Sequence, residues 1–302
     1  MKYNILTPRR CAFTGMSVSA LLMITHALPF VKASGTQTQD TPAIPITEVD
    51  ANSKKLEPFE EKIPGTVVKF KMIPILGGKI TILDPTKSNT PKTIEVKPTW
   101  VGKTEVTWDE YDVFLFRLDL SEEDRKAGVE AKSRPSKPYG APDRGFGHEG
   151  YPAIGISYYS AQEYCKWLSL KTGKKFRLPT SAEWQFFATA GEKKAYPLSN
   201  DDLDKVGWYW DNADDKTHEV ATKEANKWGL YDILGNAAEW AVDLDKEGYI
   251  YGGAFSDKRP LVTPYSRKKN TPDWDATDPQ NPKSKWWLKD GPFVGFRVVC
   301  EP

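Results

Sequence analysis

The sequence of 302 residues predicts an α+β fold, with two or three helices set among short strands and long irregular loops. Three observations predict it. β-branched residues flank a glycine pair near the start of the folded part, the middle of the chain repeats apolar residues at helical spacing, and the region after Gly191 breaks into short β-like pieces. With 39% hydrophobic residues the chain can bury one large core, so we expect one main domain.

The N-terminal region has the features of an export signal. Basic residues precede a mostly apolar run over residues 11–30, and small residues follow it, so residues 1–33 are predicted to be a secretory signal peptide. An uncleaved anchor is the alternative, although polar residues and Pro29 interrupt the run. Residues 34–62 are polar and rich in proline, which predicts a linker before a folded domain over residues 63–302.

Overall charge excludes one class of partner. The chain has 42 basic and 41 acidic residues, so it lacks the positive field that nucleic-acid binding requires. Once the signal is removed, we expect no membrane span, and we expect the mature protein to be secreted or periplasmic.

Two short strands are predicted first, over residues 67–74 and 79–83, and Gly77-Gly78 between them favours a hairpin. A helix is then predicted over residues 108–118, where apolar side chains recur at helical spacing after a possible N-cap at Thr107.

Two further helices follow in the middle of the chain. One is capped by Ser157 or Ser160 and ends at residues 172–173, with an apolar stripe that belongs to the core. The other begins at Thr180, which forms a capping-box pattern with Glu183, and ends at Gly191.

The segment over residues 229–240 combines carboxylates with tight-turn glycine. Asp232 and Glu239 supply carboxylates, while Gly235 and Ala237 between them offer backbone carbonyls, and sets of oxygen ligands suit Ca²⁺. The segment has no Cys or His, which argues against zinc. The alternative is that both acids cap a turn and pair with a base such as Arg297.

Several motifs together resemble the formylglycine-generating enzyme, or sulfatase-modifying factor, family. They are Glu105-Val106-Thr107, the segments 152–157 and 177–184, the Gly-Leu-Tyr-Asp run at residue 229, Gly252-Gly253-Ala254-Phe255, and the segment 295–299. The resemblance covers about residues 63–300. It implies a variant of the C-type-lectin-like fold stiffened by calcium, with one calcium site on the Asp232 and Glu239 side chains and the Gly235 and Ala237 carbonyls.

The mature chain keeps Cys165 and Cys300, an even pair available for one disulfide, or else two buried free thiols. The resemblance implies that they pair, because exported members join a cysteine on the matching helix to one beside the terminal Gly-Phe-Arg. Cys300 lies two residues beyond that position, which keeps the same face of a strand.

The resemblance fails at the catalytic centre. Enzymes of the family oxidise a cysteine of a sulfatase peptide with O₂ and copper(I), which two cysteines hold because copper(I) needs soft thiolates. Here Asp257 and Val262 occupy those positions, so no copper is predicted and no catalytic residue is assigned. His148 and His218 are too few for the three-histidine iron site of related enzymes, and we interpret them as hydrogen-bonding residues.

The sequence therefore predicts an exported, calcium-stabilised pseudoenzyme that serves as a binding or assembly module for an unknown peptide, protein or glycan. The candidate surface is aromatic and comprises Trp208, Trp210, Phe255, Tyr265, Trp274, Trp286 and Trp287. Alternatively, the last three tryptophans only pack their loop down. The rival hypothesis is an oxidoreductase that converts a sulfatase cysteine to formylglycine through a non-standard site, and the missing cysteines argue against it.

Overall fold

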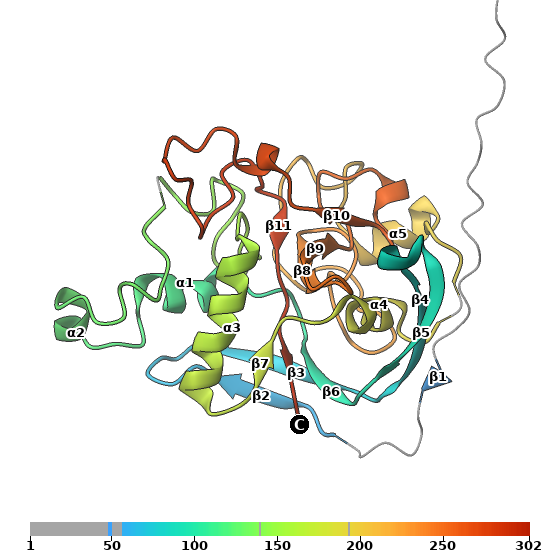
Figure 1. Ribbon diagram of the computed structural model, residues 1–302, viewed down its shortest axis with the longest axis horizontal. Coiled ribbons are helices and arrows are strands. Elements are labelled where there is room, and N and C mark those ends of the chain that lie inside the picture. Colours follow the sequence, from blue (N-terminus) through green and yellow to red (C-terminus); the bar gives the residue numbers. More distant parts are fainter. Residues whose placement is uncertain (1–47, 50–55, 139, 193) are drawn as a thin grey trace, which may run out of the picture. The chain divides into compact units, whose positions relative to one another are not determined.

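The computed structural model describes residues 48–49 and 56–302 apart from 139 and 193, so the expected signal peptide lies outside the described residues. A five-stranded antiparallel sheet has the order β2-β3-β6-β12-β7. Its strands are β2 (Phe59–Lys62), β3 (Lys69–Ile75), β6 (Thr99–Gly102), β12 (Val299–Cys300) and β7 (Phe176–Arg177). The last strand of the chain thus pairs between two earlier ones (Figure 1).

Two smaller sheets complete the β-structure of the described residues. One has the order β1-β4-β5 and the other β10-β9-β8-β11, in which β11 runs parallel to β8. Their strands are β1 (Glu48–Val49), β4 (Gly78–Asp84), β5 (Thr90–Val96), β10 (Arg267–Lys269), β9 (Gly248–Tyr251), β8 (Ala238–Val242) and β11 (Val294–Gly295).

The strands predicted on either side of Gly77-Gly78 exist, but the hairpin between them is wrong. β3 pairs with β2 and β6, whereas β4 pairs with β1 and β5, so the glycine pair carries the chain from one sheet to another. A Cβ on Gly77 would lie 2.8 Å from the Val96 carbonyl oxygen, which explains the glycine by close approach. β2 also lies inside the expected linker, which therefore ends before Phe59.

The three predicted helices are present, and local capping defines their starts. α1 (Trp108–Phe116) and α4 (Ser181–Thr189) begin with capping boxes at Thr107 and Thr180, and the Ser157 side chain caps α3 (Tyr158–Thr172). Two short helices were not predicted, α2 (Glu122–Lys126) and α5 (Asn200–Val206). They bury no side chain and one side chain respectively, so they show no apolar stripe.

Three 3₁₀ turns interrupt the loops of the described residues, each with a proline in its first turn: Pro85–Lys87, Arg259–Leu261 and Pro272–Asp275. The mixture of few helices, small sheets and long loops is the predicted α+β class.

Aromatic residues of α1 and α3 form the centre of the main core. Tyr111 and Tyr164 stack with 5.8 Å between ring centroids, and Phe296 meets Tyr164 edge to face at 5.2 Å. The Tyr111 hydroxyl lies 2.6 Å from Ser160 Oγ, so this polar group is satisfied within the core. The two helices are thereby fixed against each other and against the end of the chain.

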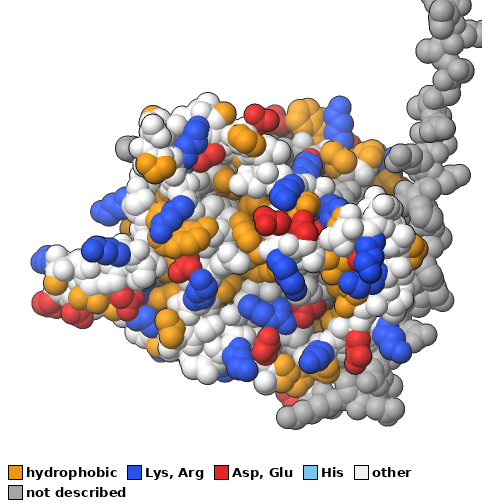
Figure 2. Space-filling view, viewed as in Figure 1, with side chains coloured by type: hydrophobic (Ala, Val, Ile, Leu, Met, Phe, Trp, Pro, Cys, Tyr) orange, Lys and Arg blue, Asp and Glu red, His pale blue; other side chains and the backbone are white. Residues whose placement is uncertain are grey.

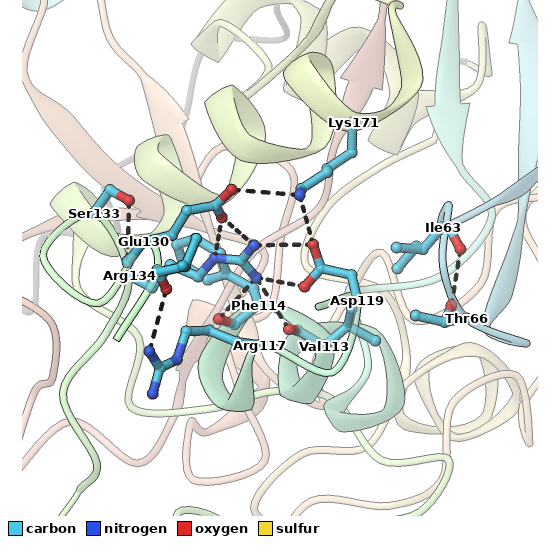
Figure 3. Close-up of polar contacts among 11 residues, drawn as sticks. Ile63, Thr66, Val113, Phe114, Arg117, Asp119, Glu130, Ser133, Arg134 and Lys171 are labelled. Carbon is cyan, nitrogen blue, oxygen red and sulfur yellow. Dashed lines mark hydrogen bonds and ion pairs between the residues drawn. The ribbon is translucent and has the colours of Figure 1, made fainter. Parts of the chain in front are cut away.

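Arg134 holds the segment between α1 and α3 that contains α2 (Figure 3). Its buried guanidinium donates to both oxygens of Asp119, at 2.7 and 2.9 Å, and pairs with Glu130. Lys171 of α3 reaches Asp119 at 2.8 Å. The ion pairs therefore join the segment around α2 to α1 and α3, and the Arg134–Asp119 pair is buried where solvent screens it little.

Basic and acidic side chains are interleaved over the face of the molecule in Figure 2 rather than gathered into a field of one sign. This distribution matches the near-zero net charge of the sequence. Among the described residues, no helix is both long and apolar enough to cross a membrane.

Candidate functional site

The segment over residues 229–240 forms a tight turn that leads into β8. Asp232, Gly235 and Asn236 all have positive φ angles, of 52°, 82° and 52°. A Cβ on Gly235 would lie only 2.2 Å from the Trp208 carbonyl oxygen, so glycine is required there. Asn236 donates its N–H to that same oxygen at 2.7 Å, which ties the turn to the Trp208 segment.

Glu239 of this turn forms a buried ion pair with Arg297. Nη2 of Arg297 lies 2.7 Å from Oε1, and Nε lies 3.1 Å from both carboxylate oxygens. Trp184 of α4 donates its indole N–H to Oε2 at 2.8 Å. The alternative interpretation from the sequence, in which Glu239 pairs with Arg297, is therefore correct for Glu239.

Asp232 is different, because it keeps one oxygen unused. Oδ2 accepts the backbone N–H of Ala221 at 2.6 Å, while Oδ1 is buried and has no hydrogen-bond partner among the described residues. Burial raises the pKa of Asp232 to about 6. A buried carboxylate with a free oxygen either holds a proton or faces a cation.

A third carboxylate, Glu105, was missed as a site residue. It accepts the backbone N–H of Ala237 at 3.1 Å, and burial together with the charges of Asp232 and Glu239 raises its pKa well above the ordinary range. Its place in the Glu-Val-Thr motif before α1 gave no sign of this, because the contact spans 132 positions of sequence.

Three buried carboxylates thus surround one guanidinium. Arg297 also donates to the carbonyl oxygens of Gly102 and Tyr231, each at 2.8 Å. The excess of acidic groups and the free Oδ1 of Asp232 fit a hard cation such as Ca²⁺. No group of three or more His, Cys, Asp or Glu side chains is arranged to hold a metal in the part of the chain that the structure describes. Calcium on two carboxylates and two backbone carbonyls therefore stays a prediction.

The two positions where the family carries copper-binding thiols are structural in this chain. Asp257 is buried; its Oδ2 accepts the backbone N–H of Ala254 at 3.1 Å and its Oδ1 pairs with Lys268. Val262 is fully buried in an apolar cluster and packs against Gly253. One position therefore closes a turn and the other fills a core, and neither supplies a soft ligand.

Both cysteines of the described residues are buried free thiols, so the disulfide implied by the resemblance is not formed in the structure. The surroundings of the two sulfurs differ. Arg177 acts electrostatically on Cys165, whereas Lys174 and Glu61 act on Cys300. Burial raises the pKa of Cys300 to about 11, so this thiol is unreactive. The pairing stays a prediction.

The two histidines are hydrogen-bonding loop residues, as interpreted from the sequence. His148 lies between Asp112 and Asp143, at 2.9 and 2.8 Å, and stacks on Trp108. His218 Nε2 lies 2.9 Å from the Ala213 carbonyl oxygen, and its ring stacks on another indole. Each histidine ties a loop to the core.

The predicted aromatic surface is only partly a surface. Phe255, Trp286 and Trp287 are buried, so the expectation that they form an exposed aromatic surface is wrong; Trp287 keeps 8% of its surface exposed and lines a small pocket. The reason is that residues 286–288 pack under the start of α3, where Ser157 donates its N–H to the Trp286 carbonyl at 3.2 Å.

The remaining aromatics of that set differ in exposure. Trp274 is half-buried against Phe293, with 5.3 Å between ring centroids, and Tyr265 is half-buried against Tyr196. Trp208 is sandwiched between His218 and Lys223. Trp210 is 49% exposed and is therefore the one member of the set that clearly faces solvent.

Comparison with known proteins identifies relatives of this arrangement. The family model described as Sulfatase-modifying factor enzyme 1-like domain matches residues 61–302. The chain is 33% identical over 147 residues to the inactive C-alpha-formylglycine-generating enzyme 2 of Bos taurus, covering 41% of this chain and 46% of that protein. It is 31% identical over 164 residues to the formylglycine-generating enzyme of Bos taurus, covering 42% of each. The chain thus spans less than half the length of these two relatives.

Solved structures support the same fold at lower identity. Treponema denticola variable protein 1 superposes with a TM-score of 0.59 at 21% identity, covering 82% of this chain and 100% of that one. PvdO from Pseudomonas aeruginosa superposes with a TM-score of 0.55 at 21% identity, covering 80% and 100%. The fold implied by the resemblance is confirmed.

Proposed function

Because the chain belongs to the sulfatase-modifying factor family, whose model matches residues 61–302, we propose that it is an exported, calcium-stabilised binding or assembly module without formylglycine-generating activity. The observation that carries this proposal is the pair of residues at the thiol positions. Asp257 is buried and pairs with the partly exposed Lys268, and Val262 is part of an apolar cluster.

The donor set does not fit copper(I), which favours soft thiolates over carboxylates. In the described part of the chain, the remaining cysteines are Cys165 on α3 and Cys300 on β12. Both are buried free thiols on elements that contain neither of the family's thiol positions. No step of copper chemistry can therefore be assigned to residues of this chain. The curated relatives include proteins named as inactive members of the family, which supports the same proposal.

Calcium would serve the scaffold in this proposal. The residues that would hold it are Asp232 and Glu239 through their side chains and Gly235 and Ala237 through their carbonyls. When bound, the ion would supply positive charge to a cluster that has three carboxylates and one guanidinium. Arg297 and Trp184 already orient the Glu239 carboxylate, so the protein holds this part of the turn by itself.

Measurement of copper(I) affinity tests the donor-set argument. The unmodified protein should fail to take copper(I) from a chromophoric chelator. The double variant D257C/V262C restores two thiols at the family positions and should bind it, provided that the turn tolerates loss of the Lys268 pair. The single variant V262C is the matched control, because one thiol gives an incomplete site. Tight copper(I) binding by the unmodified protein would contradict the proposal.

A further inference from the structure

Two segments far apart in sequence form a small pocket. Its lining includes neither the turn at residues 229–240 nor Asp257 and Val262. Residues 136–138, 141, 142 and 144 line one wall and residues 278, 280, 284, 287 and 289 line the other, and Figure 1 shows these parts of the chain in green and red close to each other. Trp287 lines the pocket and donates its indole N–H to the Ser136 carbonyl at 3.0 Å. The pocket has a volume of about 70 Å³, which admits a group of several heavy atoms.

Arg144 fastens the same two walls. Its Nη2 donates to the Leu288 carbonyl at 2.7 Å, and its Nη1 donates to the Lys289 carbonyl. These contacts hold the guanidinium at the pocket and use two of the five N–H donors that an arginine carries. The walls are therefore joined by hydrogen bonds from Trp287 and Arg144, which gives the pocket a defined shape.

In the part of the chain that the structure describes, no carboxylate lies within ion-pair distance of the Arg144 guanidinium. The two fully buried arginines do have one: Arg134 pairs with Asp119 and Arg297 with Glu239. Burial lowers the pKa of Arg144, and the nearest acids, Asp290 and Asp275, act on it only at longer range. A partly desolvated cation without a counterion is stabilised by any anion that reaches it.

The other charged groups of the pocket favour an anion as well. Lys137 and Lys289 line it, and both are exposed at its mouth. The one acidic lining residue is Asp278, whose two oxygens accept the backbone N–H groups of Gln280 and Ser284, each at 2.9 Å. Its carboxylate is therefore occupied by its own loop, and the lining residues include three cations, Lys137, Arg144 and Lys289, against this one acid.

We propose that this pocket binds a carboxylate group of a partner peptide, either a C-terminal carboxylate or an acidic side chain. The cations supply the charge, while Trp287 and the neighbouring prolines 138 and 142 give an apolar wall for the short carbon stem that carries the carboxylate. The inference rests on the binding role proposed above and names the chemistry of its ligand.

Calorimetric titration of the full mature protein with three short peptides tests this assignment. Acetyl-Ala-Ala with a free C-terminus, acetyl-Ala-Glu-amide and acetyl-Ala-Ala-amide present a terminal carboxylate, a side-chain carboxylate and none. At least one of the first two should bind, and the third should not. Which of the two binds more tightly identifies the source of the carboxylate. Binding should weaken as salt is raised, because exposed lysines contribute to it.

The double variant K137Q/K289Q should weaken binding by about fivefold, since each exposed charge contributes modestly. Neither lysine side chain takes part in a hydrogen bond or ion pair of the described structure, so the double variant should fold normally. The control variant K227Q replaces another exposed lysine and should bind the peptides as the unmodified protein does. The assignment would be overturned by any of three results. These are equal binding of all three peptides, no binding of either carboxylate-bearing peptide, and unchanged affinity in K137Q/K289Q. Conversion of a sulfatase-motif peptide would instead overturn the proposed function, so the two failures are distinguishable.

Discussion

The Arg297 guanidinium and the Glu239 carboxylate form a fully buried ion pair, with 2.7 Å between Nη2 and Oε1. This pair joins the end of the chain to the turn that identifies the family, and it has two further carboxylates, Glu105 and Asp232, as neighbours. Among the described residues, Arg297 is thus the buried cation that pairs directly with this acidic cluster, while Lys223 acts on Asp232 electrostatically.

Replacement of Arg297 should therefore be among the most destabilising single changes. The variant R297M leaves Glu239 buried without its ion-pair partner and should lose about 3–5 kcal/mol of unfolding free energy. The variant E239Q keeps the hydrogen bond from Trp184 and removes one negative charge, so it should lose clearly less. Chemical denaturation measures both. Equal losses in the two variants would contradict the role given to Arg297.

Calcium should raise the melting temperature of the mature protein. A ligand that binds only the folded state stabilises it by mass action, so excess EGTA should lower the melting temperature by several degrees at saturating calcium. The D232A variant removes the free Oδ1 and should melt at the same temperature with and without EGTA. Unmodified protein whose melting temperature does not respond to EGTA would rule out a structural calcium ion.

The Arg134 network should contribute far more than a surface ion pair. The R134Q variant leaves Asp119 buried without its bidentate partner and should lose about 3 kcal/mol. Lys126 and Glu122 of α2 form an exposed pair at an i,i+4 spacing, so K126Q should lose at most about 0.5 kcal/mol. A similar loss in both variants would mean that the buried network does not fix the segment around α2.

Glu110 gives a pH dependence of known sign. Burial raises its pKa to about 7 from the usual 4.5, so the folded state holds more protons than the unfolded state between these values. The contribution of Glu110 to the free energy of unfolding is therefore fully present below pH 4.5. It is lost as the pH rises through 7, and the total loss is on the order of 3 kcal/mol. The E110Q variant should remove this component from the pH profile of unfolding. An unchanged profile would contradict the assignment.

The helices could be predicted because their determinants are local. Thr107, Ser157 and Thr180 lie within three residues of the groups that they cap, and the structure places all three helices at these caps. The sheet partners could not be predicted in the same way. The glycine pair at residue 77 suits a hairpin, but the strand after it finds its partner through packing with the residues that follow.

The site shows the same division between local and distant contacts. Asp232 and Glu239 could be identified because they stand in one short segment. Glu105 could not, because 132 positions separate it from Ala237, whose N–H it accepts. The buried tryptophans at 286 and 287 were misassigned for a related reason: an indole suits a core and a binding surface equally, and only tertiary packing decides between them.

The central claim is that this chain has kept the fold of its family and lost the copper chemistry. Mass spectrometry of a sulfatase-motif peptide tests it most directly, after incubation of the mature protein with copper, reductant and O₂, with bovine formylglycine-generating enzyme as the positive control. We predict that the peptide cysteine stays unchanged beyond the enzyme-free reaction. Conversion of that cysteine to formylglycine by the unmodified protein, with repeated turnover, would contradict the account.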